Sequence, residues 1–438
     1  MIDNNDILKK ARKDKVELVY LNFSDINGTL KSVTIPVEKL ERALGKGVWF
    51  DGSSIEGFTR IDESDLYLKP DVKTYALVPW EKETKTARLI CDVFTPDDKP
   101  FEGDPRFVLK REIEKARKLG FEYFTGPELE FFLFEPNGQK KTVFHDKAGY
   151  FDATPSDKAG EIRKEIMFSL KNFGISAETS HHEVAEGQHE IGFTYDTALR
   201  TSDNALTLKM VVKSIASAHG LNASFMPKPV FGINGSGMHV HQSLFREGKN
   251  VFYDEKKDYN LSETALHFIA GQLNHARAMS AIVSPTINSF KRLIPGYEAP
   301  VYICWGQRNR SALIRIPRTF RGDASAARAE LRCPDPSANP YLALTVMLEA
   351  GLDGIKNKMM PVKPLEESAY GMNRQKRQEL EIRELPFSLA EAVEELKNDE
   401  VIFNCLGEHL KKVYVQSKEN EIREYRMQVT NWELEKYF

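Results

Sequence analysis

Two glutamates stand two residues apart in the otherwise apolar stretch 126–133. Side chains alternate between the faces of a β-strand, so on a strand Glu128 and Glu130 share one face. Neighbouring carboxylates repel each other unless a cation or a proton lies between them. A solvated strand edge is the simpler interpretation, but the surrounding Phe and Leu residues make a wet edge less favourable. The pair therefore predicts a metal site.

Histidines and further acids are concentrated in two other segments. Residues 181–190 hold seven ionisable or amide side chains, although a solvated polar turn accounts for this segment equally well. Residues 234–243 begin as a glycine-rich turn and continue as a strand on which His239, His241 and Ser243 share a face. A lone histidine is usually a core residue, but two at strand spacing after a flexible turn favour contact with a ligand or a phosphate.

Arginines flank an acid in the last of these polar segments. Arg328, Glu330 and Arg332 alternate with apolar residues, and three more arginines lie upstream at 308, 310 and 315. A buried ion-pair ladder is one explanation, but this many guanidinium groups suits a polyphosphate or carboxylates. Together with the acids and histidines they form a set suited to phosphoryl transfer assisted by Mg²⁺ or Mn²⁺. The P-loop, Rossmann, nucleophile-elbow and zincin motifs are all absent from the sequence.

The elements that must position these residues form an α+β pattern. Residues 16–23 and 29–35 read as strands joined by an Asn27-Gly28 turn, and residues 87–94 read as another strand. The Pro-bearing segment 95–100 predicts a domain boundary, placed near residue 103, which gives domains 1–103 and 104–438. Amphipathic helices are expected over 161–173 and 206–218, and strands over 127–133, 237–243 and 327–332. Segment 373–384 is expected to be a solvated helix or a surface loop.

Composition narrows the classes of protein. The 438 residues carry 61 Lys and Arg against 64 Asp and Glu, a net charge of -3, which gives no field for nucleic acid. Four widely spaced cysteines predict buried thiols rather than disulfides or a zinc finger. The acidic N-terminus and the short apolar runs predict neither a signal peptide nor a membrane span. We expect a cytoplasmic protein.

Six segments, read in order, resemble type I glutamine synthetase, in its short, alpha-like subgroup. They are residues 51–54, 126–130, 182–185, 234–241, 291–298 and 308–311. The resemblance implies a small N-terminal β-grasp domain and a large catalytic domain with a curved antiparallel sheet flanked by helices. It also implies a homododecamer of two stacked hexameric rings, active sites between adjacent subunits, and a helical C-terminal tail, ending in residues 432–438, that joins the rings.

The resemblance further implies a role for each matching residue. One metal ion would be held by Glu130, Glu183 and Glu190, and another by Glu128, His239 and Glu330, with Mg²⁺ or Mn²⁺ as the cofactor and at least two ions per site. The contacts to the substrate ATP would be Glu178, Tyr195, His241, Ser243, Arg310 and Arg315. L-glutamate would meet Asn234, Gly235, Arg292, Glu298 and Arg332. Ammonium would be bound by Asp51, Ser54, Tyr150, Glu183 and Glu298.

The implied reaction forms γ-glutamyl phosphate from glutamate and ATP, which ammonia then displaces. Asp51, Glu298 and Arg310 would be the catalytic residues, with Asp51 accepting the ammonium proton from across a subunit boundary. Two rivals remain: a glutamate–amine ligase of the γ-glutamylpolyamine type on the same scaffold, and a non-catalytic relative. The intact ammonium residues and the complete ligand set argue against them.

Regulation is also addressed by the resemblance. Tyr370 lies where longer family members carry a nucleotidylated tyrosine, but residues 368–372 match that neighbourhood poorly, so we predict no such modification. Arg60 resembles a position linked to feedback inhibition by glutamine. A PII-type regulatory protein is a partner implied by the family alone.

Overall fold

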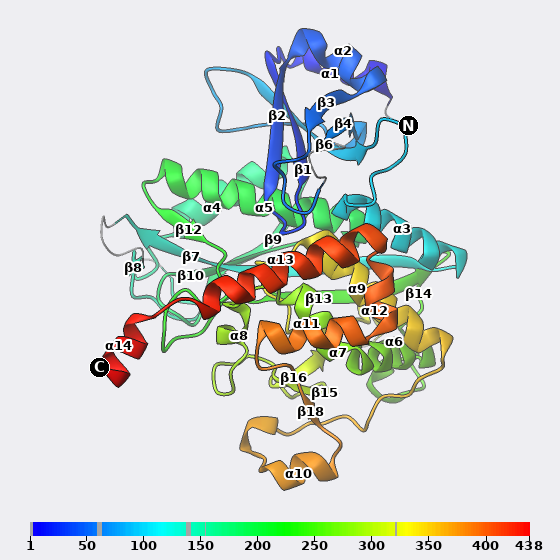
Figure 1. Cartoon of the computed structure of the whole chain (residues 1–438), viewed down its shortest axis with the longest axis vertical. Helices are drawn as coiled ribbons and strands as arrows, with labels where there is room; N and C mark the ends of the chain where they lie inside the picture. The colour runs from blue at the N-terminus through cyan, green and yellow to red at the C-terminus, as the bar shows by residue number, and fades with distance from the viewer. Residues whose placement is uncertain (1–2, 59–63, 137–141, 154, 320–321) are drawn as a thin grey trace.

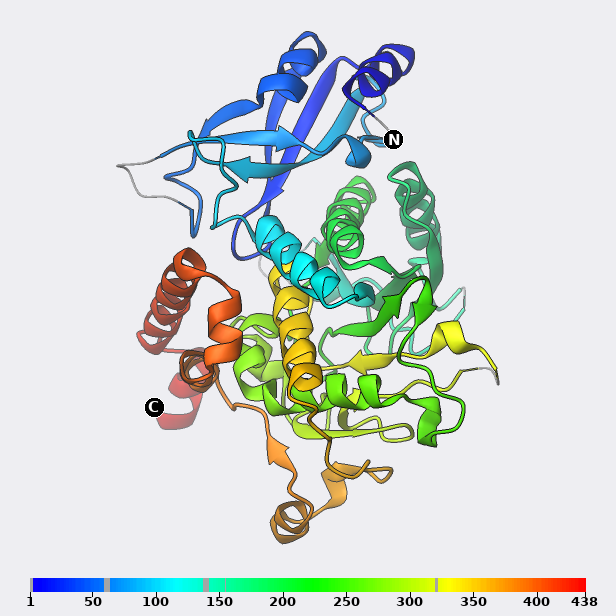
Figure 2. The same cartoon turned by 90° about the vertical axis from the view of Figure 1, so that its right-hand side faces the viewer.

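The computed structural model describes residues 3–58, 64–136, 142–153, 155–319 and 322–438. Two β-sheets organise them, a small one formed by the N-terminal residues and a large one surrounded by helices (Figure 1). Figure 2, turned by a right angle, shows the N-terminal sheet standing at one end of the larger body. The fold is α+β, as the sequence predicts.

The N-terminal sheet has six strands, with the path β2-β1-β6-β4-β3 and β5 paired to β6. Their bounds are β1 Leu18–Ser24, β2 Leu30–Pro36, β3 Val48–Asp51, β4 Asp65–Pro70, β5 Ala76–Leu77 and β6 Thr86–Phe94. The predicted hairpin is confirmed, because β1 and β2 pair antiparallel across the Asn27-Gly28 turn. The central pair, β1 and β6, is parallel. Helices α1 (Asn4–Lys13) and α2 (Leu40–Lys46) accompany this sheet, where Ile7, Leu40 and Leu44 join its core.

The tip of the first hairpin rests on the larger body. Gly28 has a φ of 74°, and a Cβ added there would lie 2.9 Å from the Asn339 Cα. The Asn339 side chain donates to the Asp25 carbonyl at 2.9 Å. Glycine is therefore required by both the turn and the close approach.

The large sheet has twelve strands, with the path β18-β15-β16-β17-β13-β7-β10-β9. The strands on this path are β7 Glu122–Glu135, β9 Ala177–His182, β10 Gln188–Phe193, β13 Met238–Arg246, β15 Tyr302–Gly306, β16 Ala312–Arg315, β17 Ala329–Leu331 and β18 Arg383–Glu384. The short strands beside it are β8 Val143–Phe144, β11 Asp196–Thr197, β12 Asn222–Ser224 and β14 Lys249–Asn250. The pairs along the path are antiparallel except β15 with β16, which is parallel. The expected antiparallel sheet is thus present with one parallel pair near its edge.

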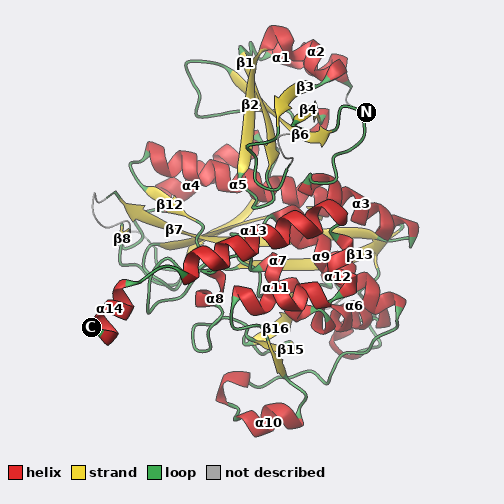
Figure 3. Cartoon of the chain, viewed as in Figure 1, coloured by secondary structure: helices red, strands yellow, loops and turns green. Residues whose placement is uncertain are grey.

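Helices pack around this sheet (Figure 3). They are α3 Pro105–Lys118, α4 Gly160–Asn172, α5 Ala198–Ala218, α6 Glu263–Asn274, α7 Ala276–Val283, α8 Ser289–Arg292, α9 Pro340–Lys356, α10 Arg374–Glu379, α11 Leu389–Asn398, α12 Glu400–Cys405, α13 Glu408–Arg426 and α14 Asn431–Tyr437. The helix expected over 161–173 is confirmed by α4. The one expected over 206–218 is part of α5, which begins eight residues earlier. Its first two turns bury polar residues such as Thr201, Ser202 and Asp203, so they lack the apolar periodicity that reveals the rest.

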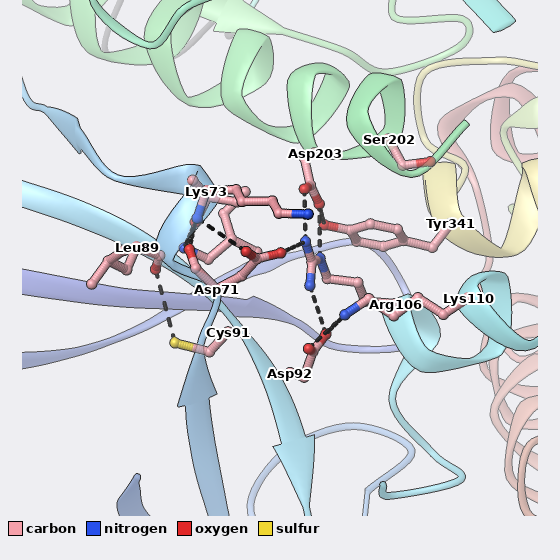
Figure 4. A network of polar contacts seen from close by, with 12 residues as sticks. Asp71, Lys73, Leu89, Cys91, Asp92, Arg106, Lys110, Ser202, Asp203 and Tyr341 are labelled. Carbon is pink, nitrogen blue, oxygen red and sulfur yellow. Dashed lines mark hydrogen bonds and ion pairs between the residues drawn. The ribbon is translucent and has the colours of Figure 1, made fainter. Parts of the chain in front are cut away.

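A buried ion-pair network joins the two parts of the chain (Figure 4). Arg106, near the start of α3, pairs with Asp71 at 2.8 Å and Asp92 at 2.6 Å in the N-terminal part. Its other contact is Asp203 of α5, at 2.9 Å, which also accepts from the Tyr341 hydroxyl at 2.6 Å. One guanidinium group therefore ties β6 and the segment after β4 to α5 and α9.

The C-terminal helices lie on the outside. α13 crosses the body and is followed by α14, whose Trp432, Leu434 and Tyr437 are exposed (Figure 1). Segment 373–384 contains α10 and β18, so it is partly a solvated helix, as expected. All four cysteines are buried free thiols, which confirms that prediction. Among the described residues, every helix is too short or too polar to cross a membrane.

Candidate active site

Strand register brings the predicted acids and histidines into one row across the large sheet. Glu190 of β10 lies directly opposite Glu130 of β7, and Glu128 of β7 lies opposite His239 of β13. Glu330 of β17 lies between His241 of β13 and Arg315 of β16, directly opposite each of them. Residues directly opposite each other on paired strands share a face, so the five neighbouring strands β16, β17, β13, β7 and β10 present these polar side chains together.

The other face of β13 confirms the alternation expected from the sequence. Met238, Val240 and Gln242 are buried on the helix side, whereas His239 and His241 are half-buried on the polar side. The Gln242 amide is held there by Tyr123 at 2.7 Å and by Gln272. One face of the strand therefore packs, and the other is free for chemistry.

Positively charged neighbours neutralise the acids at one end of the row. His241 Nε2 lies 2.9 Å from Glu128 Oε1, and Glu330 is paired to Arg332 at 2.8 Å and to Arg315 at 2.9 Å. Burial opposes ionisation of Glu128, but hydrogen bonds with His239 and His241 outweigh it and lower its pKa. Burial likewise opposes ionisation of Glu330, and Arg332 and the two histidines lower its pKa overall. The ion-pair ladder considered for this region is therefore confirmed in part: Arg332 pairs with Glu330, but the second partner is Arg315 of the next strand, and Arg328 donates to His241 instead.

At the other end the acids face one another. Burial, followed by repulsion from Glu128, Glu130, Glu183 and Glu330, raises the pKa of Glu190 to about 10. Burial and repulsion from Glu183 raise the pKa of Glu130 to about 8. These carboxylates have more negative charge around them than the protein balances, which is the condition that a bound cation relieves.

The donor atoms fit hard divalent cations. Three-residue clusters with ligand atoms within 4.8 Å of one another are formed by Glu128, His241 and Glu330 and by His181, Glu183 and Glu190. His239 Nδ1 also lies 3.8 Å from Glu128 and 3.9 Å from Glu330. These sets overlap the predicted ones but include His241 and His181. Carboxylate oxygens with one imidazole suit Mg²⁺ or Mn²⁺ better than zinc.

Four of the predicted ATP contacts line one cavity of about 350 Å³ at the edge of the row. They are Glu178, Tyr195, His241 and Ser243. Tyr195 is 49% exposed, which leaves its ring free, and Glu128 lines the same cavity. Arg328, which the sequence places on the same strand face as Glu330, also lines it and donates to His241 Nδ1 at 3.3 Å. The cavity therefore connects an exposed aromatic ring with the acid row.

Three of the residues predicted to meet glutamate, Arg292, Gly235 and Arg332, lie beside one another and next to the row. Arg292 is buried, and its two Nη atoms donate to the backbone carbonyls of residues 332, 333 and 334. A Cβ at Gly235 would lie 2.2 Å from the Pro227 carbonyl oxygen and 3.1 Å from Arg292 Cγ, so only glycine fits. Arg332 is buried and pairs with Glu330, and its Nε has no hydrogen-bond partner among the described residues.

A tight turn at 295–298 follows α8, the helix that ends with Arg292. Glu298 has a φ of 57°, an uncommon conformation for a residue other than glycine, and the Tyr297 ring stacks against Lys228 Nζ at 3.9 Å. Burial, then Glu183, raises the pKa of the half-exposed Tyr150 hydroxyl, with smaller effects from Arg310, Glu190 and Glu298. Glu183, Glu298 and Arg310 thus each lie close enough to Tyr150 to act on its hydroxyl electrostatically.

The structure does not bring two predicted residues to this row. Asp51 ends β3 in the N-terminal sheet and is exposed, as is Ser54. Its carboxylate accepts from the Ser53 backbone at 2.8 Å, and this hydrogen bond is the first cause of its lowered pKa. The described hydrogen bonds and ion pairs connect neither residue to the large sheet. Arg60 lies outside the described residues.

Two supporting residues were missed by sequence reasoning. Gln188 donates to Glu130 at 2.9 Å and to the Gly235 carbonyl at 3.1 Å, and the Gly237 N–H donates to the same Glu130 oxygen at 3.0 Å. Its spacing from Glu190 on β10 could have revealed it, since residues two apart share a face. Asp146 is fully buried and accepts from His182 at 3.1 Å, while His182 bonds the Glu183 carbonyl at 2.7 Å. Asp146 lies on a loop far from these strands in sequence, and no spacing signals it.

Fold and site define a two-domain α+β enzyme whose antiparallel sheet carries a row of acids. Models of the glutamine synthetase β-grasp domain and of the glutamine synthetase catalytic domain match residues 15–96 and 102–437. The chain is 54% identical over 434 residues to the glutamine synthetase of Thermotoga maritima, covering 98% of each chain. It is 53% identical to that of Thermus thermophilus, covering 99% of this chain and 98% of the other.

Solved structures agree with these matches. The chain superposes on GmaS in complex with ADP with a TM-score of 0.91 and 32% identity, covering 99% of each chain. It superposes on Plasmodium falciparum glutamine synthetase with a TM-score of 0.91 and 27% identity, covering 100% of this chain and 99% of the other. The chain belongs to the glutamine synthetase family, of type I, and the predicted fold is confirmed.

Proposed function

We propose that the chain is a glutamate–ammonia ligase, which joins ammonia to the γ-carboxylate of L-glutamate and converts ATP to ADP and phosphate. The observation that carries this proposal is the row of acids in register across β17, β13, β7 and β10, with a nucleotide-sized cavity at its edge. The glutamine synthetases at 54% and 53% identity support the same activity.

The acid row is the proposed site of two or more Mg²⁺ or Mn²⁺ ions. Glu130, Glu183 and Glu190 would hold one ion, and Glu128, His239 and Glu330 another. His241 lies close enough to Glu128 and Glu330 to serve as a ligand in place of His239. The surplus charge around Glu190 supports this assignment. Bound ions would neutralise the anionic oxygens that meet when a carboxylate approaches a triphosphate.

The cavity beside the row is the proposed ATP site. Tyr195 would stack on the adenine, Glu178 and Ser243 would contact the nucleoside, and His241, Arg310 and Arg315 would contact the phosphates. The exposed Tyr195 ring supports the first role, because an aromatic face left open to solvent can accept a base. Arg315 pairs with Glu330 in this structure, so the same guanidinium group lies where it could also contact the phosphates and stabilise the negative charge that develops on them.

Glutamate would enter from the opposite end. Asn234, Gly235, Arg292 and Arg332 are proposed to hold its α-amino and α-carboxylate groups, and Glu298 to close over the reacting carboxylate. The free Nε of the buried Arg332 supports this, since an unpaired buried donor calls for an anionic partner. The turn that carries Glu298 would exclude water from the γ-glutamyl phosphate formed in the first step.

The second step needs ammonia next to that intermediate. Tyr150, Glu183 and Glu298 of one subunit, with Asp51 and Ser54 of a neighbouring subunit, are proposed to bind ammonium, and Asp51 to take its proton. Asp51 is exposed and its lowered pKa keeps it ionised, so it is suited to act on another copy of the chain. The proposed assembly is accordingly a homododecamer of two hexameric rings, joined by the exposed C-terminal helix.

The proposals on regulation stay predictions. Tyr370 is half-buried and its hydroxyl donates to the Ala299 carbonyl at 2.5 Å, which supports the absence of a nucleotidyl modification there. Feedback inhibition through Arg60, a PII-type partner and a cytoplasmic location have no further support. The rival glutamate–amine ligase is disfavoured by the curated relatives, and the non-catalytic relative by the complete set of ligands.

The deciding experiment measures ADP and glutamine release from ATP, Mg²⁺ and glutamate, with and without ammonium, on protein whose size is determined in the same buffer. We expect ammonium-dependent glutamine from a particle of about twelve chains. ADP release only with a larger amine would instead support the amine ligase. A well-formed ring that releases no ADP would contradict catalysis.

A second experiment tests Asp51. Asp51→Ala should reduce ammonium-dependent glutamine formation far more than ATP-dependent formation of γ-glutamyl phosphate. Asp65→Ala, which removes the acid opposite Asp51 on β4, is the matched control. Normal ammonium kinetics in the Asp51 variant would refute its role as the proton acceptor.

A further inference from the structure

A second cavity, of about 220 Å³, lies between the two parts of the chain, away from the acid row. Its N-terminal side is formed by α1, by the segment 73–75 and by β6. Its other side is formed by the C-terminal end of α4 and the first turns of α5. It shares no lining residue with the proposed ATP cavity.

The charge of this cavity is strongly positive. Its cationic lining residues are Lys10, Lys73, Arg88, Lys171 and Arg200. The one acid that lines it, Asp203, is already paired with Arg106 and accepts from the Tyr341 hydroxyl (Figure 4). The acid therefore has little charge left with which to neutralise five cations.

Arg88 is the clearest sign that something is missing. Its side chain is 4% exposed, yet its described hydrogen bond is a single one, from Nη1 to the Thr207 hydroxyl at 3.0 Å. Its Nε is buried without a partner, and the described residues place no carboxylate within ion-pair distance. The guanidinium group also faces the Phe173 ring at 4.9 Å, a weak substitute for an anion.

Arg106 lies at the same interface and is a buried arginine whose charge is paired with acids. It is equally buried and contacts three aspartates. Burial lowers the pKa of Arg88 to about 10, so it still carries its charge at neutral pH. A buried charge without a direct ion-pair partner is costly, and Asp203, the acid that acts on Arg88 across the cavity, is already paired with Arg106.

We propose that this interdomain cavity binds a small polyvalent oxyanion, either a phosphate group or a compact polycarboxylate. Arg88 would bind it from within, and the lysines would meet it from the rim. The volume is too small for a nucleotide but sufficient for an anion of this size. Because the cations come from both parts of the chain, the anion would also hold the N-terminal sheet against α4 and α5.

The test is calorimetric titration of the full assembled protein with inorganic phosphate and, separately, with citrate, at constant ionic strength set by chloride and without divalent metal. We expect one of the two anions to bind the wild type and to bind Arg88→Gln about 10- to 100-fold more weakly. Tighter binding of phosphate would assign a phosphate-bearing ligand, and tighter binding of citrate a polycarboxylate.

Two further variants keep the test decisive. Lys171→Gln changes an exposed lysine at the rim, so it should fold normally and still weaken binding. Lys46→Gln removes an exposed lysine of α2, outside the cavity, and should bind as the wild type does. Phosphate binding in the proposed ATP cavity would persist in every variant, so the difference between variants reports on this cavity alone. Equal binding by the wild type, Arg88→Gln and Lys171→Gln would overturn the proposal.

Discussion

Two clusters of like charge lie in this molecule, and they differ in how they are built. The acid row sits on one face of a single sheet, where register fixes every neighbour and His241, Arg315 and Arg332 balance part of the charge. The basic cavity collects its cations from separate elements of both parts of the chain, and Arg88 has no ion-pair partner among the described residues. A cluster of like charge that the protein does not balance thus indicates a ligand of opposite charge: a cation for the acid row and an anion for the basic cavity.

The largest expected effect comes from removing one carboxylate of the acid row. Glu330→Ala should reduce turnover by more than about 10³-fold, because it removes a proposed metal ligand and leaves Arg315 and Arg332 unpaired. Steady-state glutamine formation measures this, with circular dichroism to confirm folding. Glu114→Ala, on the exposed side of α3, is the control and should keep its activity. A Glu330 variant with near-normal turnover would show that the row is structural only.

Arg106 and Arg88 allow a buried charge that has ion-pair partners to be compared with one that has none. Arg106→Gln leaves Asp71 and Asp203 without their ion-pair partner, whereas Asp92 keeps Lys110, and the variant should lower the free energy of unfolding by about 3–5 kcal/mol. Arg88→Gln removes a charge that has no partner and should cost little or increase stability in anion-free buffer. Urea unfolding midpoints of the two variants, measured side by side, check this. Equal losses would mean that Arg88 is balanced by the protein itself.

Gln188 tests how far the acid row depends on the groups that hold it. Gln188→Ala frees Glu130 from its amide donor, so the Mg²⁺ concentration for half-maximal activity should rise by about 10- to 100-fold, with a smaller change in kcat. Gln375→Ala, an exposed amide of α10, serves as the control. An unchanged Mg²⁺ requirement would remove Gln188 from the metal site.

The smallest expected effect is a pH dependence that arises in the acid row and that Mg²⁺ should suppress. The pKa values of Glu130 and Glu190 are raised to about 8 and about 10, so their protonated forms stabilise the fold. That stability is complete below the ordinary glutamate pKa and is lost as pH rises through these values. The thermal midpoint of EDTA-treated protein should therefore fall between pH 6 and pH 9, and Mg²⁺ should restore it. A slope that is undiminished in Glu190→Gln would contradict this origin.

Sequence patterns revealed the acid row and not the basic cavity, for a physical reason. Glu128, Glu130, His239 and His241 follow the two-residue period of a strand, so their shared face can be read directly. Arg88 and Lys171 acquire a common environment only when β6 packs beside the end of α4. The same reason hid the first turns of α5, whose buried polar residues make tertiary contacts rather than an apolar stripe, and the parallel pairing of β15 with β16.

The position of strand β7 limits which sequence changes the chain can accept during evolution. It pairs with β13 and β10 on its two sides and carries Glu128 and Glu130 toward the site. Substitutions on its buried face would be tolerated where volume is kept. One inserted or deleted residue before Glu128 would turn both carboxylates into the helix layer and bring Leu129 to the substrate side. We therefore expect length changes in related sequences to fall in loops such as 145–153, and the strand itself to keep its length.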